Sequence, residues 1–116
     1  MNIALMAHDN RKELMVQFCT AYCGILAKHT LCATARTGQQ IAALIAYNEI
    51  DMVLCFGDPN QKTPDADITY ISRLCDQNNI PFASNVATAE MLVLGLSRGD
   101  LDWRDIVNPK TKPFTA

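Results

Sequence analysis

Acidic, basic and hydroxyl side chains gather where the apolar runs of this sequence end. The apolar run 50–56 stops at Gly57, and the carboxylate of Asp58 follows directly. A carboxylate at such a position can take up a proton, and a histidine can donate one. Polar residues follow three other apolar runs: His8 and Asp9, residues 34–37, and Asn85. Because ligands of open α/β sheets bind beyond the carboxyl ends of the strands, we expect a small-molecule site there.

Two of these segments can also bind an anion. Lys12 lies one turn into the helix expected after Asp9, and a helix N-terminus beside a lysine suits a phosphate. Hydroxyl, guanidinium and amide donors for phosphate oxygens follow the second apolar run: Thr34, Arg36, Thr37 and Gly38. This stretch matches neither a Walker loop nor a dinucleotide-binding fingerprint, so an ordinary capped turn remains an alternative.

Each candidate residue also has a purely structural explanation. Asp9 or Asn10 can simply cap the helix that follows them, and Asp67 is an ordinary helix-starting acid. Asp58 precedes a proline, as many turn residues do. His8 can equally be a hydrogen-bonded structural histidine. We interpret His29, just past a helix end, as a partner of the helix dipole only. The place of Asp58 at the exit of a central strand favours function for that residue.

The elements that position these residues alternate between strand and helix patterns. Apolar runs predict strands at 2–7, 31–35, 50–56 and 80–85. Helical spacing predicts four helices: one carrying the apolar stripe from Leu14 to Leu26, then 38–48, 67–78, and 88–96, the last ended by Gly99. The sequence therefore predicts an α/β fold, a three-layer, doubly wound and mainly parallel sheet with helices on both faces. We expect one domain over residues 1–107, with Trp103 packed on it or on a neighbouring subunit, and a frayed tail at 108–116.

Composition excludes several classes of function. Of the 116 residues, 49% are hydrophobic and 19% charged, and the net charge is −2, without a basic block for nucleic acid or a run long enough to span a membrane. We expect no signal peptide. The five cysteines form no Cys-x-x-Cys pair, so we expect buried thiols, no disulfide framework, no metal site and a reducing cytoplasm.

The order of these motifs resembles the methylglyoxal synthase family. Residues 3–9 with Lys12 are similar to that family's opening strand and loop, and Thr34 and Thr37 to its threonine-rich phosphate turn. The segment 51–59 resembles its central strand and aspartate. Further matches follow in family order over nearly the whole chain: Asp67, 73–76, 80–81, 85–90 and 98–102.

The resemblance implies a flavodoxin-like domain that assembles as a homo-oligomer, usually a hexamer, and needs no cofactor. It implies dihydroxyacetone phosphate as substrate, which loses a proton beside its carbonyl, forms an enediolate and expels inorganic phosphate to give methylglyoxal. On this reading Lys12, Thr34 and Thr37 hold the phosphate. The reacting carbons are surrounded by His8, Asp9, Asp58 and Asp67.

Three departures from the family bear on catalysis. The family's Ser-Gly-Pro-x-Gly-Gly-Asp loop, which supplies the aspartate assigned as base, has no counterpart, because Gly38 is followed directly by two glutamines. Pro64 and Asp65 stand where the family has a histidine, and Arg36 replaces a threonine. Asp58 and Asp9 are the remaining carboxylates that can act as base.

Two functional hypotheses follow. The first is a lyase that forms methylglyoxal from dihydroxyacetone phosphate, with weak activity if the base is poorly replaced. The second is a non-catalytic module that senses phosphate or a phosphorylated metabolite, by analogy with the regulatory domain of carbamoyl phosphate synthetase. A response-regulator receiver is discounted, because Asn85 occupies the strand exit where receivers need a lysine.

Overall fold

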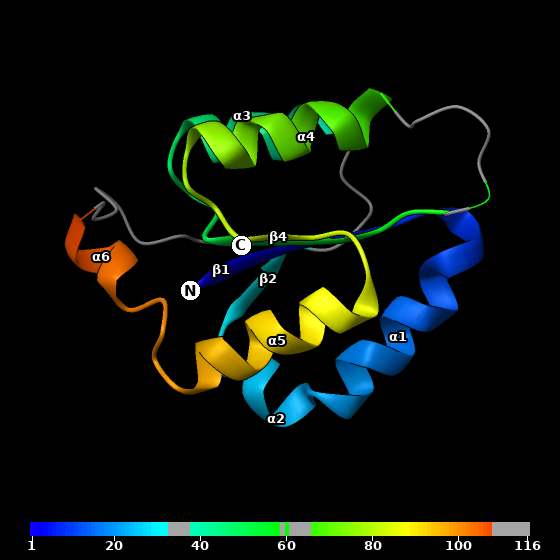
Figure 1. Cartoon of the computed structure of the whole chain (residues 1–116), viewed down its shortest axis with the longest axis horizontal. Coiled ribbons are helices and arrows are strands. Elements are labelled where there is room, and N and C mark those ends of the chain that lie inside the picture. Colours follow the sequence, from blue (N-terminus) through cyan, green and yellow to red (C-terminus); the bar gives the residue numbers. More distant parts are fainter. Residues whose placement is uncertain (33–37, 59, 61–65, 108–116) are drawn as a thin grey trace.

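The computed structural model describes residues 1–32, 38–58, 60 and 66–107. Within them, strands and helices alternate: β1 (Asn2–Ala7), η1 (Asp9–Arg11), α1 (Lys12–Ala21), α2 (Cys23–Leu26), β2 (Thr30–Cys32), α3 (Gly38–Ala46), β3 (Met52–Phe56), α4 (Ala66–Gln77), β4 (Phe82–Ala83), α5 (Val86–Ser97) and α6 (Trp103–Val107). The four described strands form one parallel sheet in the order β2-β1-β3-β4. Helices α3 and α4 cover one face and α1, α2 and α5 the other (Figure 1). The predicted three-layer α/β fold is confirmed.

The two-residue period of the central strands divides the core between the two faces. In β3, Met52, Leu54 and Phe56 pack in the cluster under α1, α2 and α5, whereas Val53 and Cys55 pack under α3 and α4. All five residues of β3 are buried. The unbroken apolar run thus has the burial expected of a central strand covered on both faces.

The apolar stripe of the first helical segment is also confirmed. Met15, Phe18 and Leu26 are buried against the sheet, and Phe18 meets Phe56 edge-to-face with ring centroids 5.6 Å apart. The predicted single helix is, however, interrupted at Tyr22, whose backbone leaves the helical region at φ −109° and ψ 20°. The N–H of Tyr22 still donates to the Phe18 carbonyl at 3.1 Å, so the stripe continues into α2.

Several predicted boundaries change because side chains take over backbone hydrogen bonds. β3 begins at Met52, since the side chain of Asp51 accepts the Asn2 N–H at 2.8 Å. β4 ends at Ala83, since Asn85 accepts the Thr88 N–H at 2.9 Å and caps α5, which starts at Val86. The described part of β2 starts at Thr30, and the predicted extension over 33–35 lies outside the described residues.

The end of α5 follows the prediction, but the segment after it does not. Gly99 has a positive φ of 81°, and its N–H donates to the Leu96 carbonyl, which closes the helix. Beyond it lies α6, a short helix that the sequence pattern did not predict. Trp103 is 46% exposed on this helix, while its neighbour Arg104 is only 2% exposed.

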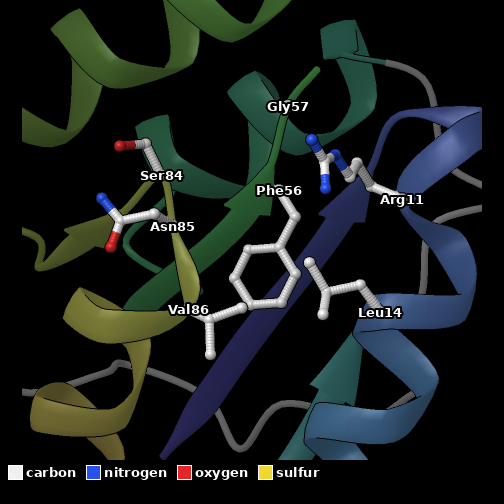
Figure 2. Close-up of a pocket in the computed structure, with 7 residues that line it drawn as sticks. All are labelled: Arg11, Leu14, Phe56, Gly57, Ser84, Asn85 and Val86. Atoms are coloured by element: carbon white, nitrogen blue, oxygen red, sulfur yellow. The ribbon is translucent and has the colours of Figure 1, made fainter. Parts of the chain in front are cut away.

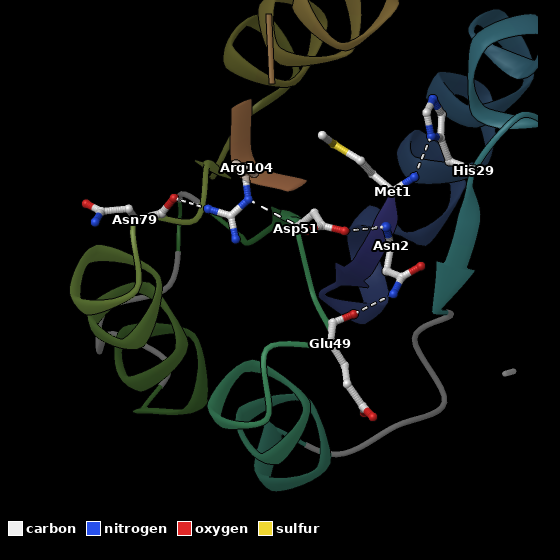
Figure 3. A network of polar contacts seen from close by, with 7 residues as sticks. All are labelled: Met1, Asn2, His29, Glu49, Asp51, Asn79 and Arg104. Carbon is white, nitrogen blue, oxygen red and sulfur yellow. Dashed lines mark hydrogen bonds and ion pairs between the residues drawn. The ribbon is translucent and has the colours of Figure 1, made fainter. Parts of the chain in front are cut away.

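Arg104 ties α6 to the amino-terminal edge of the sheet (Figure 3). Its guanidinium donates from Nη1 to the Asn79 carbonyl, and its Nε lies 3.6 Å from Asp51 Oδ1, with both side chains almost fully buried. Arg104 Nε makes no hydrogen bond among the described residues, so its link to Asp51 is an ion pair only. At the same edge, the amino-terminal ammonium donates to His29 Nδ1 at 2.9 Å.

The predicted role of His29 is therefore wrong. Its ring pairs with the charged amino terminus of the first strand instead of with a helix end. Burial and then the neighbouring ammonium charge lower the pKa of His29, which favours the neutral ring that can accept this hydrogen bond.

We expect Arg104→Ala to destabilise the fold strongly, because it leaves the buried Asp51 carboxylate without its cation. Removing one partner of a buried ion pair costs about 3–5 kcal/mol, a large part of the stability of a small domain. Arg98→Ala is the matched control, since the Arg98–Asp100 pair is exposed, and we expect a loss of about 1 kcal/mol or less. Urea unfolding curves measure both. Equal losses in the two variants would contradict the role given to Arg104.

Candidate functional site

The register of β1 and β3 brings two predicted site residues together. These strands pair in parallel from Ile3 opposite Met52 to Ala7 opposite Phe56. The His8 N–H then donates to the Phe56 carbonyl at 2.9 Å, so pairing continues to the very end of both strands. Because β2 lies on the other side of β1, the strand order reverses between β1 and β3. This is the topological switch point, where doubly wound sheets bind their ligands.

Asp58 follows β3 and is held by two donors from different loops. Its Oδ1 accepts the Asn60 N–H at 2.9 Å, and its Oδ2 accepts the Asn10 side-chain amide at 2.9 Å. The Asn60 bond, followed by the Asn10 bond, lowers the pKa of Asp58 below its ordinary value, and the charges of His8 and Arg11 act in the same direction. Asp58 is therefore ionised in neutral solution. The hydrogen bonds from Asn60 and Asn10 fix the orientation of its carboxylate.

Asn10 connects this carboxylate to the predicted histidine. Its side-chain Oδ1 lies 2.8 Å from His8 Nδ1, while its amide nitrogen contacts Asp58. The sequence suggested Asn10 only as a helix cap, and its contact with Asp58 joins residues 48 positions apart. No local pattern could reveal this contact, because it depends on the pairing of β1 with β3.

The other predicted site residues lie only partly within the described part of the chain. Lys12 is the exposed first residue of α1, directly after η1, and Gly38 is the first residue of α3. Asp9 lies in η1 and Asp67 in α4, but neither side chain is part of what the structure describes. Three phosphate-binding candidates lie outside the described residues: Thr34, Arg36 and Thr37.

A pocket of about 270 Å³ lies beside the switch point, on the side of the sheet covered by α1 and α5 (Figure 2). The side chains of Phe56, Leu14 and Val86 meet at its apolar base, and Arg11 lies across from them beside Gly57. The side chains of Ser84 and Asn85 point away from the Phe56 ring. A pocket of this size and lining fits a small metabolite with a short carbon chain.

Within the described residues, no three His, Cys, Asp or Glu side chains gather as metal ligands do. Among the helices of the same part of the chain, none has the length and apolar character needed to cross a bilayer.

The described cysteines are free thiols, and Cys55 and Cys75 are buried as expected, whereas Cys23 is exposed on the short α2. Burial raises the pKa of Cys75 to about 12, so this thiol stays protonated.

We expect Asp58 to stabilise the folded chain at neutral pH and to lose this effect in acid. Its pKa is lower in the folded than in the unfolded chain, so the contribution is present above the unfolded pKa and disappears as the pH falls through the folded one. Thermal unfolding from neutral pH down to about 3 compares the wild type with Asp58→Asn. The difference in melting temperature should shrink with acidification; a constant difference would contradict this assignment.

Known proteins resemble this chain over most of its length. The model of the MGS-like domain family matches residues 24–84. The methylglyoxal synthase of Caldicellulosiruptor saccharolyticus is 52% identical over 133 residues, covering 95% of this chain and 94% of that protein. The methylglyoxal synthase of Oceanobacillus iheyensis is 44% identical, with 95% of each chain covered. Among solved structures, methylglyoxal synthase from Elizabethkingia anophelis superposes with a TM-score of 0.69 at 29% identity, covering 79% of this chain and 76% of that one.

The alignment also shows that this chain is shorter than its relatives. It spans 133 positions, whereas 95% of this 116-residue chain is about 110 residues, so about 23 positions have no counterpart here. This agrees with the missing loop expected from the sequence. Despite this difference in length, the sequence identity is 52% and the alignment covers more than nine-tenths of both this chain and the Caldicellulosiruptor protein. The fold also matches that of a solved methylglyoxal synthase. The chain therefore belongs to the methylglyoxal synthase family.

Proposed function

We propose that this chain is a carbon–oxygen lyase that converts dihydroxyacetone phosphate into methylglyoxal and inorganic phosphate. Membership of the methylglyoxal synthase family supports the reaction. The observation that carries the proposal for this chain is the ionised Asp58, held by Asn60 and Asn10 beside His8 at the switch point of the sheet. A non-catalytic phosphate sensor would need no such oriented carboxylate.

Asp58 acts as the base in this proposal. It takes a proton from the hydroxymethyl carbon beside the substrate carbonyl, and the electron pair of that C–H bond forms the enediolate. The enediolate then expels phosphate, which leaves with the electron pair of the C–O bond. The resulting enol takes up a proton on its terminal carbon, releases its hydroxyl proton and becomes methylglyoxal. The negative charge that builds on the enediolate oxygen is offset by hydrogen-bond donors and cationic side chains at the carboxyl-terminal edge of the sheet.

The electrostatics of Asp58 suit this role in one respect and limit it in another. Its lowered pKa keeps the carboxylate unprotonated throughout the neutral range, so it is always ready to accept a proton. The same shift makes it a weaker base, because proton transfer is favoured by a pKa near the working pH. A well-placed general base contributes about 10²–10⁴-fold in rate. We therefore expect turnover at the low end of what a positioned base provides.

The phosphate is held, in this proposal, between the starts of α1 and α3. Lys12 is the first residue of α1 and Gly38 is the first residue of α3. The proposal assigns phosphate binding to these two helix N-termini together with the Lys12 ammonium. Thr34, Arg36 and Thr37, which come just before α3 in the sequence, supply the remaining donors. His8, Asp9 and Asp67 complete the surroundings of the reacting carbons, with Asp9 as the second carboxylate that can act as base.

Assembly and location remain predictions. We propose that the chain forms a homo-oligomer in the cytoplasm, with a hexamer implied by the resemblance. The exposed apolar side chains of α5, Met91 at 73% and Leu94 at 43% exposed, support an interface on that helix.

We expect the purified protein to form methylglyoxal from dihydroxyacetone phosphate and Asp58→Asn to reduce kcat by about 10²-fold or more, because the amide cannot accept the proton. A coupled assay for methylglyoxal measures the rates. Asp76→Asn is the matched control, since it removes an exposed carboxylate on α4, away from the strand exits, and should keep the wild-type rate.

Two outcomes would contradict the proposal. Wild-type turnover that persists in Asp58→Asn would remove Asp58 from the chemistry. No turnover in the wild type, with inorganic phosphate still raising the melting temperature, would show that the fold binds the anion without catalysing the reaction.

A further inference from the structure

The amide of Asn10 lies between the two groups that follow β1 and β3. Its nitrogen donates to Asp58 Oδ2 at 2.9 Å, and its oxygen lies 2.8 Å from His8 Nδ1. Both contacts have the length of good hydrogen bonds, and both can form only with the amide in one orientation. Asn10 itself is exposed and sits in the three-residue turn of η1, so packing does not impose this position.

The direction of each hydrogen bond follows from the chemistry of the groups. An ionised carboxylate can only accept, so the amide must present its NH₂ group to Asp58. The Asn10 oxygen then faces His8, and an amide oxygen can only accept. His8 Nδ1 must therefore carry a proton.

Among the described contacts of His8, one would require the opposite arrangement, with a lone pair on Nδ1. The backbone N–H of Asn10 lies 3.4 Å from the same His8 Nδ1, and it would need a lone pair there. This distance exceeds the ordinary range for such bonds, whereas the 2.8 Å contact to the amide oxygen falls within it. The shorter contact decides the position of the proton.

We propose that Asn10 is a positioning residue that holds neutral His8 in the tautomer protonated on Nδ1 and, with the same amide, orients Asp58. The lone pair of the neutral ring then lies on Nε2, so His8 accepts a hydrogen bond or a proton at that atom. The consequence for catalysis rests on the proposed function, but the tautomer itself does not. In the reaction, the Asn10 side chain determines which ring nitrogen of His8 can accept a proton. The same side chain fixes the orientation of the Asp58 carboxylate, the proposed base.

The tautomer can be read directly from the full-length protein without substrate. Long-range ¹H–¹⁵N correlation spectra at alkaline pH, where the ring is neutral, distinguish a protonated from an unprotonated ring nitrogen. The chain has only two histidines, and a spectrum of His8→Gln assigns them. We expect the shift of a protonated nitrogen at Nδ1 of His8 and of an unprotonated nitrogen at Nε2.

Two substitutions separate the two contacts of Asn10. Asn10→Ala removes both contacts, so we expect neutral His8 to lose its preference for the tautomer protonated on Nδ1. We also expect kcat to fall by up to about 10²-fold, as when a reacting group is misplaced. Asn10→Asp keeps an acceptor for His8 but places a second carboxylate against Asp58, so the Nδ1–H tautomer should persist while kcat falls. Asn78→Ala is the control, because it removes an exposed asparagine amide that lies between α4 and β4, away from the ends of β1 and β3, and should change neither readout.

A proton found on Nε2 of His8 in the wild type overturns the proposal, and so does a tautomer that is unchanged in Asn10→Ala. Because the spectra need no turnover, a wild type with Nδ1–H but no methylglyoxal formation supports this assignment while it contradicts the proposed function. An unaltered kcat in Asn10→Asp, in an active wild type, overturns the orienting role toward Asp58.

Discussion

The parallel pairing of β1 with β3 is the constraint on which the rest of the structure depends. It runs from Ile3 opposite Met52 to the hydrogen bond between the His8 N–H and the Phe56 carbonyl. A shift of one residue would exchange the side chains of the two faces and disrupt both halves of the core. The same shift would separate His8 and Asn10 from Asp58. Core packing and site geometry are thus fixed by one register.

The two edges of the sheet use polar groups differently. At the amino-terminal edge, Asp51 and Arg104 are buried, and their contacts close the domain around the first strand and α6. At the carboxyl-terminal edge, Asp58, Asn10 and Lys12 are accessible, and the hydrogen bond from Asn10 orients the Asp58 carboxylate. The first set stabilises the fold, whereas the second set lies where we propose that the ligand binds. This division is what the strand polarity of a doubly wound sheet leads us to expect.

Much of this organisation could be predicted from the sequence. The alternation of β3 between two clusters follows from an unbroken apolar run between two helices, and the position of Asp58 follows from the end of that run. Arg104 could not be predicted, because its five-residue helix has no apolar period and its partner Asp51 lies 53 positions earlier in the chain. Local spacing predicts Asn10 only as a helix cap, because its contact with Asp58 arises from the pairing of β1 with β3. The phosphate-binding roles of Thr34, Arg36 and Thr37 remain predictions.

The central claim is that the substrate phosphate and the base share the edge where β1 and β3 end. Amide chemical shifts of the full chain during titration with inorganic phosphate test it most directly, with the amino-terminal edge as an internal reference. The account predicts saturable shifts at Asn10, Lys12, Gly38 and Asp58 and none at Asn2, Asn79 and Arg104. Shifts confined to the second group, or no saturable shift at all, would contradict it.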